Sequence, residues 1–418
     1  MKNTVTSLKE LIVSITCAID LMSFLVKNHH QRVAIISYEL GKAMHLKPRD
    51  LNNLVLAASL HDIGATSIKV RNDLIKMDVE NPEEHAELGA RMLGTFPYFD
   101  GITNIIKHHH AHWNNGAGTH IDGEKVPVEC FILHLADRID ILIDPDRWIL
   151  DEKELVREKI KEYRGTLFYP EVVDKFLEIS ANDNFWLNLN YINLETLLNS
   201  VLIDEERMIL DADMFQLFAM TLSNISDYRS KYTVGHSVGV SEVAYELAGL
   251  AGLNENTRKD LRIAGLLHDF GKIAIPQEVL DKKGELTEGE FNIIRAHSYY
   301  TGKILSNISG ISEISKWTLL HHERCDGSGY PFGLKDNEID KNVSVLILAD
   351  IFTALREDRS YRDAINLDEA MEIIRFRINA HPTNDNINEL IEIVKNNSIS
   401  LDNIREIKQK EAVDYFMS

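Results

Sequence analysis

Residues 267–271 read Leu-His-Asp-Phe-Gly, and residues 60–64 read Leu-His-Asp-Ile-Gly. The two pentapeptides lie 207 positions apart (267 − 60 = 207). Around each of them, further histidines and one further aspartate recur in the same order at nearly constant spacing. This self-similarity indicates a tandem duplication, in which two related domains follow one another along the chain.

The repeated residues are all of metal-ligand type. The series in the second half is His236, His268, Asp269, His297, His321, His322 and Asp350. The series in the first half is His29, His61, Asp62, His85, His109, His110 and Asp137. The offset is 207 through the His-Asp doublet, 212 over the next three members and 213 at the last aspartate. Residues with independent structural roles would not reproduce this spacing.

The hydrophobic pattern is helical along nearly the whole chain. Val240, Val243, Leu247 and Leu250 recur at steps of three and four residues. Strand-like alternation is hard to find, and the glycines and prolines lie mostly between the periodic stretches. We therefore predict an all-α protein with two tandem helical domains, residues 1–183 and 212–418, joined by a helical connector, residues 184–211.

Composition and charge exclude several classes of function. The 418 residues carry a net charge of −20, which repels nucleic-acid polymers. Three scattered cysteines cannot form a disulfide framework, so we predict a cytoplasmic protein. The apolar stretch 11–26 is interrupted by Asp20 and is shorter than a bilayer span, so no membrane association is expected.

Five histidines and two aspartates in one copy are too many ligands for one tetrahedral zinc ion. They suit two borderline divalent ions such as iron, manganese, zinc or nickel. The aspartate of the His-Asp doublet, Asp269, is the natural bridge between the two ions. Two such ions about 3.5–4 Å apart favour in-line displacement at phosphorus, which predicts phosphodiester hydrolysis.

The second half carries motifs of a known family. Residues 268–272 read His-Asp-Phe-Gly-Lys, residues 321–331 read His-His-Glu-Arg-Cys-Asp-Gly-Ser-Gly-Tyr-Pro, and residues 359–362 read Arg-Ser-Tyr-Arg. This region, about 211–396, resembles the HD-GYP subgroup of the HD phosphohydrolases. The resemblance implies HD-type helical domains and hydrolysis of a 3′,5′-linked cyclic dinucleotide with two iron or manganese ions.

The resemblance also assigns individual roles. It makes the seven residues of the second series the metal ligands, with Asp269 and Lys272 as catalytic residues. Lys272, Arg359 and Arg362 would bind the substrate phosphates, and Tyr330 would line the substrate pocket. Some members bind a third metal through a glutamate four residues before the first histidine. Here that position is Tyr232, so two metals are expected.

The first copy keeps every ligand type, but the positions that match the phosphate-binding cations do not keep their charge. Ala65 matches Lys272, and Asp146 and Ile149 match the two arginines. The Gly-Tyr-Pro triplet is also missing from this copy. We therefore predict a second metal site in the amino-terminal domain and a regulatory role for it, rather than turnover of a cyclic dinucleotide. The alternatives are a catalytic site for a different phosphate compound and a dimerisation module in which the histidines are packing residues.

The main hypothesis is a metal-dependent phosphodiesterase that linearises cyclic di-GMP, or next 3′3′-cyclic GMP-AMP, with a homodimer as the candidate assembly. One alternative is an HD nucleotide phosphohydrolase that acts on a dNTP or a guanosine polyphosphate. The other is a non-catalytic signalling protein that binds a nucleotide. Cyclic dinucleotide turnover by the purified protein distinguishes these hypotheses.

Overall fold

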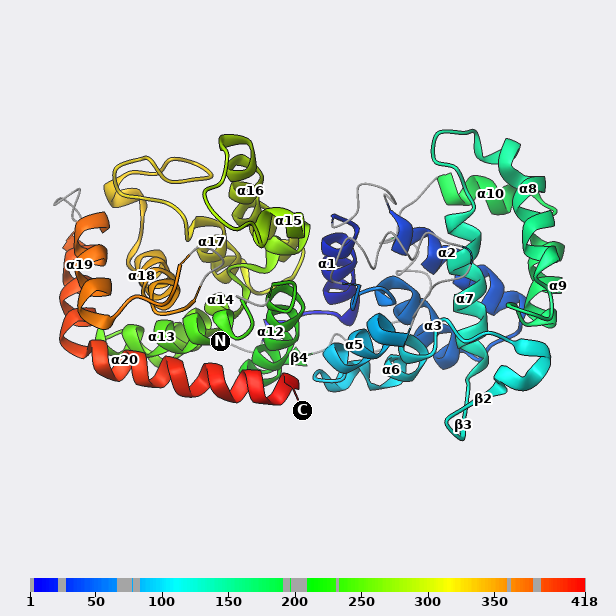
Figure 1. Cartoon of the computed structure of the whole chain (residues 1–418), viewed down its shortest axis with the longest axis horizontal. Helices are drawn as coiled ribbons and strands as arrows, with labels where there is room; N and C mark the ends of the chain where they lie inside the picture. The colour runs from blue at the N-terminus through cyan, green and yellow to red at the C-terminus, as the bar shows by residue number, and fades with distance from the viewer. Residues whose placement is uncertain are drawn as a thin grey trace. The chain divides into compact units, whose positions relative to one another are not determined.

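The fold is described from a computed structural model of the whole chain (Figure 1), in which residues 4–21, 28–65, 77, 83–190, 196, 209–230, 233–358, 362–378 and 385–417 are described. The chain divides into two compact units. One unit comprises residues 11–207, and the other comprises residues 208–418 together with residues 1–10. We call them the amino-terminal and the carboxy-terminal unit.

The carboxy-terminal unit is a bundle of helices. Its elements are β1 (Thr4–Val5), β4 (Ile209–Leu210), α12 (Ala212–Asp227), α13 (His236–Leu250), α14 (Glu255–Leu267), η3 (Phe270–Ala274), α15 (Gln277–Leu280), α16 (Glu288–Leu305), α17 (Ser312–Leu320), η4 (Asp336–Glu338), α18 (Lys341–Leu355), α19 (Leu367–Ile378) and α20 (Asp385–Met417). Helix α13 packs against α14, α18 and α20. In Figure 1 the long helix α20, drawn in red, runs beside α13.

Helix α18 explains how a carboxylate comes to lie inside this bundle. Its sequence is apolar on nearly every face, as expected for a helix surrounded by protein. Residues 343–349 are all buried, and Asp350 follows them directly. At its amino end, Asp340 accepts hydrogen bonds from the backbone N–H groups of Asn342 and Val343, which fixes where the helix begins.

The amino-terminal unit repeats this arrangement. Its elements are α1 (Leu8–Leu21, which begins in the other unit), α2 (His29–Ala43), α3 (Pro48–Leu60), α5 (Glu83–Leu93), η1 (Pro97–Phe99), α6 (Asp100–Lys107), η2 (Asn114–Thr119), β2 (His120–Ile121), β3 (Glu124–Lys125), α7 (Val128–Ile141), α8 (Ile149–Glu162), α9 (Pro170–Ile179) and α10 (Asp183–Asn190). Helix α2 packs against α3, α7 and α9. Helix α7, buried from Cys130 to Asp140, corresponds to α18.

The predicted all-α class is confirmed, because the regular secondary structure of the described residues is helical apart from two short two-stranded sheets. Of the predicted connector, residues 184–190 lie in α10, which packs on α8, and residues 209–210 form β4, which pairs with β1. Most of the remainder lies outside the described residues. Among the described helices, none combines the length and the apolar character that crossing a membrane requires.

Candidate metal centre and substrate cavity

Six elements of the carboxy-terminal unit bring the predicted ligands together. His236 is the first residue of α13, and His268 and Asp269 lie between α14 and η3. His297 is in α16, His321 and His322 follow α17, and Asp350 is in α18. The structure gathers these residues into two groups, namely Asp269, His297, His321 and His322, and His236, His268 and Asp350.

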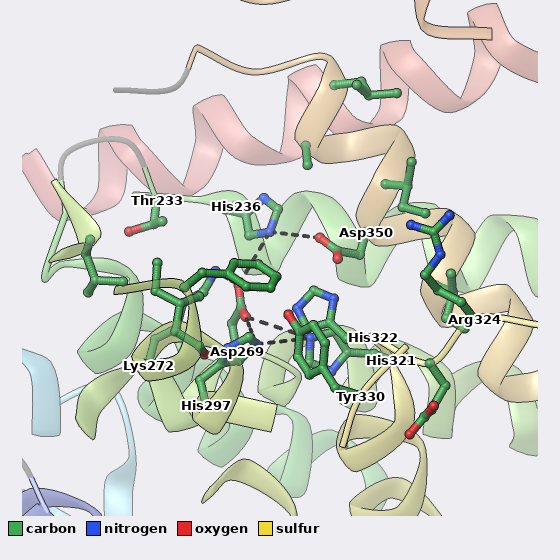
Figure 2. Close-up of a pocket in the computed structure, with 18 of the residues that line it drawn as sticks. Thr233, His236, Asp269, Lys272, His297, His321, His322, Arg324, Tyr330 and Asp350 are labelled. Atoms are coloured by element: carbon green, nitrogen blue, oxygen red, sulfur yellow. Dashed lines mark hydrogen bonds and ion pairs between the residues drawn. The ribbon is translucent and has the colours of Figure 1, made fainter. Parts of the chain in front are cut away.

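The carboxylate of Asp269 lies between the two groups. Its Oδ1 is 3.2 Å from Nε2 of His297 and 3.9 Å from Nε2 of His321. Its Oδ2 is 3.2 Å from Nε2 of His268 and 3.7 Å from Nε2 of His236. One oxygen therefore faces each group, which is the arrangement of a bridging carboxylate. Figure 2 shows Asp269 between His236 and the histidines of the other group.

The ligand atoms of the second group lie equally close to one another. Oδ1 of Asp350 is 3.4 Å from Nε2 of His236 and 3.7 Å from Nε2 of His268. The three ligand atoms lie within 4.8 Å of one another. Such a set of two imidazoles and a carboxylate, with the bridging oxygen as a fourth donor, suits a divalent transition metal.

Hydrogen bonds to the backbone orient three of the imidazole rings. Nδ1 of His268 lies 2.8 Å from the Gly265 carbonyl, and Nδ1 of His297 lies 2.6 Å from the Ile294 carbonyl. His321 makes the same contact with the Thr318 carbonyl at 2.6 Å. Because a carbonyl only accepts, each Nδ1 carries the proton and each Nε2 keeps a free lone pair toward the cluster.

The fourth ring is oriented by a carboxylate that sequence reasoning missed. Nδ1 of His236 lies 2.8 Å from Oε2 of Glu357, and the other oxygen of Glu357 accepts a hydrogen bond from the Gln409 side chain. Glu357 is 121 positions from His236 along the chain, so no local spacing could have revealed this contact. Carboxylates that support a ligand histidine in this way raise its basicity toward the metal.

The charge states of His321, His322 and Asp269 also suit metal binding. Burial lowers the pKa of His322 to about 3, and burial together with its neighbouring histidines lowers the pKa of His321 well below the usual value. Both rings are therefore neutral, which is the form that binds a metal. Burial opposes ionisation of Asp269, but His268 and Lys272 outweigh it and hold the pKa of this carboxyl well below its usual range.

Two buried atoms at the centre of the cluster support the presence of cations. Within the described part of the chain, Nε2 of His268 and Oδ1 of Asp269 are buried and have no well-aligned hydrogen-bond partner. Buried polar atoms without a partner are costly, and in a set of imidazoles and carboxylates a bound cation removes that cost. The residues present therefore fit a pair of divalent metal ions.

A cavity of about 670 Å³ lies over these ligands. It is lined by six of the seven ligands and by Lys272, Tyr330 and Arg362, all of which were predicted from the sequence. Nζ of Lys272 is 2.5 Å from Oδ2 of Asp269. The guanidinium of Arg362 donates to the carbonyls of Ala354 and Leu355 at 2.6 and 3.3 Å. Arg359 and Tyr232 lie outside the described residues.

Tyr330 lies against a ligand of the centre. The centre of its ring is 4.8 Å from the centre of the His322 ring, and the guanidinium carbon of Arg295 lies 5.1 Å from the centre of the tyrosine ring. Burial raises the pKa of the Tyr330 hydroxyl, so the phenol stays protonated. Figure 2 shows the tyrosine beside His322 among the residues that line the cavity.

The loop that carries Tyr330 is held by Glu323, a buried residue whose role the sequence did not reveal. Its two carboxylate oxygens accept hydrogen bonds from the backbone N–H groups of Phe332 at 2.7 Å and Leu334 at 2.9 Å. Gly329 has no room for a side chain, because a Cβ there would lie 2.3 Å from the backbone nitrogen of Arg324. These contacts hold the loop against the residues that follow the ligand pair.

The amino-terminal unit also brings its seven predicted residues together. They form one group of Asp62, His85, His109 and His110 and another of His29, His61 and Asp137. Both sets of candidate ligands in the sequence thus converge in the structure, each within its own unit.

Comparisons with known proteins agree with this geometry. A sequence profile described as "HD domain" matches residues 15–164 and 214–381. The chain is 29% identical over 384 residues to "3'3'-cGAMP-specific phosphodiesterase 1" of Vibrio cholerae, covering 89% of this chain and 88% of that protein. A "Cyclic di-GMP phosphodiesterase" of Thermotoga maritima is 38% identical over 155 residues, covering 37% of this chain and 42% of that protein.

A solved structure shares the fold over nearly the whole chain. The crystal structure of a cyclic GMP-AMP phosphodiesterase of Vibrio cholerae, V-cGAP3, matches with a TM-score of 0.65 and 23% identity, covering 93% of this chain and 98% of that one. The relationship to HD-GYP phosphodiesterases that the sequence motifs predicted is confirmed.

Proposed function

The chain belongs to the HD domain family, and we propose that its carboxy-terminal unit hydrolyses a phosphodiester bond of a 3′,5′-linked cyclic dinucleotide to give a linear product. The observation that carries this proposal is the position of Asp269, whose two oxygens face two ligand groups at the floor of a cavity. The cavity volume of about 670 Å³ lies within the range of small-molecule sites.

The proposed cofactor is a pair of divalent ions, iron or manganese, held by Asp269, His297, His321 and His322 on one side and by His236, His268 and Asp350 on the other. The absence of thiolates from both groups supports these metals. When bound, two such ions lower the pKa of a water molecule and stabilise negative charge on the phosphoryl oxygens.

The protein's own side chains bind and orient the substrate in this proposal. Lys272 lies beside Asp269 at the cavity wall, where its ammonium group can donate a hydrogen bond to a phosphate oxygen. Arg362 supplies a second cation to the same cavity. The protonated Tyr330 presents a ring against which a nucleobase can stack and a hydroxyl that can donate.

We propose 3′3′-cyclic GMP-AMP as the first substrate to test, in place of cyclic di-GMP, which the sequence motifs favoured. The relative with that stated specificity aligns with 89% of this chain, whereas the cyclic di-GMP phosphodiesterase of Thermotoga maritima aligns with 37%. A regulatory role for the amino-terminal unit, a cytoplasmic location and assembly as a homodimer remain predictions from the sequence.

The test is hydrolysis by the purified full-length chain, supplied with manganese, or with ferrous iron under anaerobic conditions, and with each cyclic dinucleotide in turn. We expect a linear dinucleotide by chromatography, and none from an Asp269→Ala variant. Tight nucleotide binding without product, under metal-replete conditions, would instead support a non-catalytic signalling protein. Turnover of dNTPs or guanosine polyphosphates alone would support the nucleotide phosphohydrolase alternative.

A further inference from the structure

The amino-terminal cluster has the same geometry as the carboxy-terminal one. Oδ1 of Asp62 is 3.5 Å from Nε2 of both His85 and His109. Oδ2 of Asp62 is 3.5 Å from Nε2 of His61, and Oδ1 of Asp137 is 3.4 Å from Nε2 of His29. Asp62 thus lies between two groups. Its Oδ1 and Nε2 of His109 are buried, and no described residue gives either atom a well-aligned hydrogen bond.

In this unit, different residues form the carboxylate contact that orients the first ligand histidine. Nδ1 of His29 lies 2.7 Å from Oδ2 of Asp140, and Asp140 is held by the guanidinium of Arg32. Asp140 comes three residues after its ligand aspartate, Asp137, whereas Glu357 comes seven residues after Asp350. Two different positions of the duplicated sequence therefore supply a carboxylate to the first histidine. A copy that had lost metal binding would not require this contact.

The amino-terminal cluster also contains a histidine that the carboxy-terminal one lacks. His30 occupies the position of Ser237, at the offset of 207 (237 − 30 = 207). Its Nδ1 lies 2.8 Å from Oδ1 of Asp20, while its Nε2 is buried and has no hydrogen-bond partner among the residues that the structure describes. The side chain is only 7% exposed, and it forms a third candidate ligand group with His61 and Asp62. The ligand atoms of these three residues lie within 4.8 Å of one another, and Nε2 is the ring nitrogen of His30 that is not bonded to Asp20.

A buried arginine distinguishes the two clusters further. Arg138 follows Asp137 directly and matches Ile351, which lines the carboxy-terminal cavity beside Asp350. Nη2 and Nε of Arg138 donate to Oδ2 of Asp137 at 2.5 and 3.1 Å, and the residue is 1% exposed. The guanidinium of Arg138 thus covers Oδ2 of Asp137. In the carboxy-terminal unit the matching residue, Ile351, forms part of the wall of the substrate cavity.

We propose that the amino-terminal unit holds a second centre for two divalent transition-metal ions, in which His30 is an additional ligand and Arg138 closes the side that corresponds to the substrate cavity. This centre binds metal and does not admit a phosphate ester. It is independent of the hydrolysis proposed for the other unit, because its ligands, its supporting carboxylate and its closing arginine all lie in residues 11–207.

The test measures bound manganese per full-length chain after removal of excess metal. Wild type should hold about four ions, and Asp269→Ala and Asp62→Ala should each hold about two, since each site takes a pair. Asp62→Ala should keep most of the hydrolytic activity. An Asp269→Ala chain that folds but binds no manganese would overturn the second centre, whatever the activity of the wild type.

The role of His30 is tested in the Asp269→Ala background, where only the amino-terminal centre can bind metal. His30→Ser, which copies Ser237, should lower manganese affinity by at least about tenfold in a chelator competition, as loss of a ligand requires. His120→Ser is the matched control, because His120 is an exposed histidine of the same unit outside the cluster. Equal affinities for the His30 and His120 variants would exclude His30 as a ligand.

The role of Arg138 is tested with inorganic phosphate in the same background. Phosphate should leave the unfolding temperature of the manganese-loaded Asp269→Ala chain unchanged, and should raise it once Arg138→Met is added. If phosphate raises the unfolding temperature while Arg138 is present, Arg138 does not exclude phosphate from the amino-terminal centre. This result refutes the proposed role even if the Arg138→Met variant fails to fold. A folded Arg138→Met variant whose unfolding temperature phosphate does not raise would also refute it.

Discussion

Replacing Glu323 by alanine removes the two hydrogen bonds that hold the Tyr330 loop. Its carboxylate accepts from the N–H groups of Phe332 at 2.7 Å and Leu334 at 2.9 Å. Hydrogen bonds to a charged group contribute about 1.5–3 kcal/mol each, so the loop conformation that Glu323 holds loses about 3–6 kcal/mol of stabilisation. A free-energy difference of about 1.4 kcal/mol is a factor of ten in an equilibrium constant. The population of this conformation, relative to conformations in which the loop has detached from residue 323, therefore falls by at least about a hundredfold.

The change in loop conformation should lower catalytic activity, because the loop places Tyr330 against His322 at the cavity. We expect Glu323→Ala to lower kcat/KM for the cyclic dinucleotide by at least about tenfold, while bound manganese stays unchanged. Amide hydrogen exchange at Phe332 and Leu334 should become faster in parallel. Glu323→Gln is the control, because its amide oxygen can still accept one of the two bonds and should keep an intermediate activity.

Two results would refute this reasoning. Unchanged kcat/KM in a folded Glu323→Ala chain would show that loop closure does not matter for turnover. Unchanged exchange at Phe332 and Leu334 would show that other contacts hold the loop. A loss of manganese in this variant would instead mean that Glu323 acts on the metal centre through the adjacent His322.

Three further outcomes follow from contacts in the carboxy-terminal unit. Glu357→Ala, which removes the carboxylate partner of His236, should weaken metal binding by about 10–100-fold in a chelator titration, and unchanged affinity would contradict the supporting role. Lys272→Met should lower kcat/KM by about 10–100-fold, the equivalent of one charge-assisted hydrogen bond of about 1.5–3 kcal/mol, without loss of manganese. A loss of manganese would show that Lys272 acts through its contact with Asp269 instead. Burial raises the pKa of Asp227 to about 6 from 3.8, so its ionised form destabilises the folded chain as pH rises through this range. In the metal-free chain, Asp227→Asn should therefore raise the unfolding temperature relative to wild type at pH 7.5, by the equivalent of about 3 kcal/mol at most, and much less at pH 4. An equal shift at both pH values would contradict the assignment.

The helical fold and the candidate metal ligands were predictable from the amino-acid sequence. Apolar residues that repeat every three or four positions indicate helices, because burial on one face of a helix imposes that period. The ligands could be recognised because two copies of the same set occur in one chain at offsets of 207 to 213. A single His-Asp doublet, without its repeat, would not have indicated a metal centre.

The groups that support and modify the two centres could be found only in the tertiary structure. Glu357 reaches His236 across 121 residues, and Asp140 reaches His29 across 111. A contact between distant side chains leaves no periodic pattern in the sequence, because the packing of whole helices sets the distance. Nothing in the sequence distinguishes His30 from a residue that merely follows a ligand, and only the fold places its ring beside that of His61. Arg138 has the composition of a surface residue, and only the burial of α7 shows that it lies inside the protein.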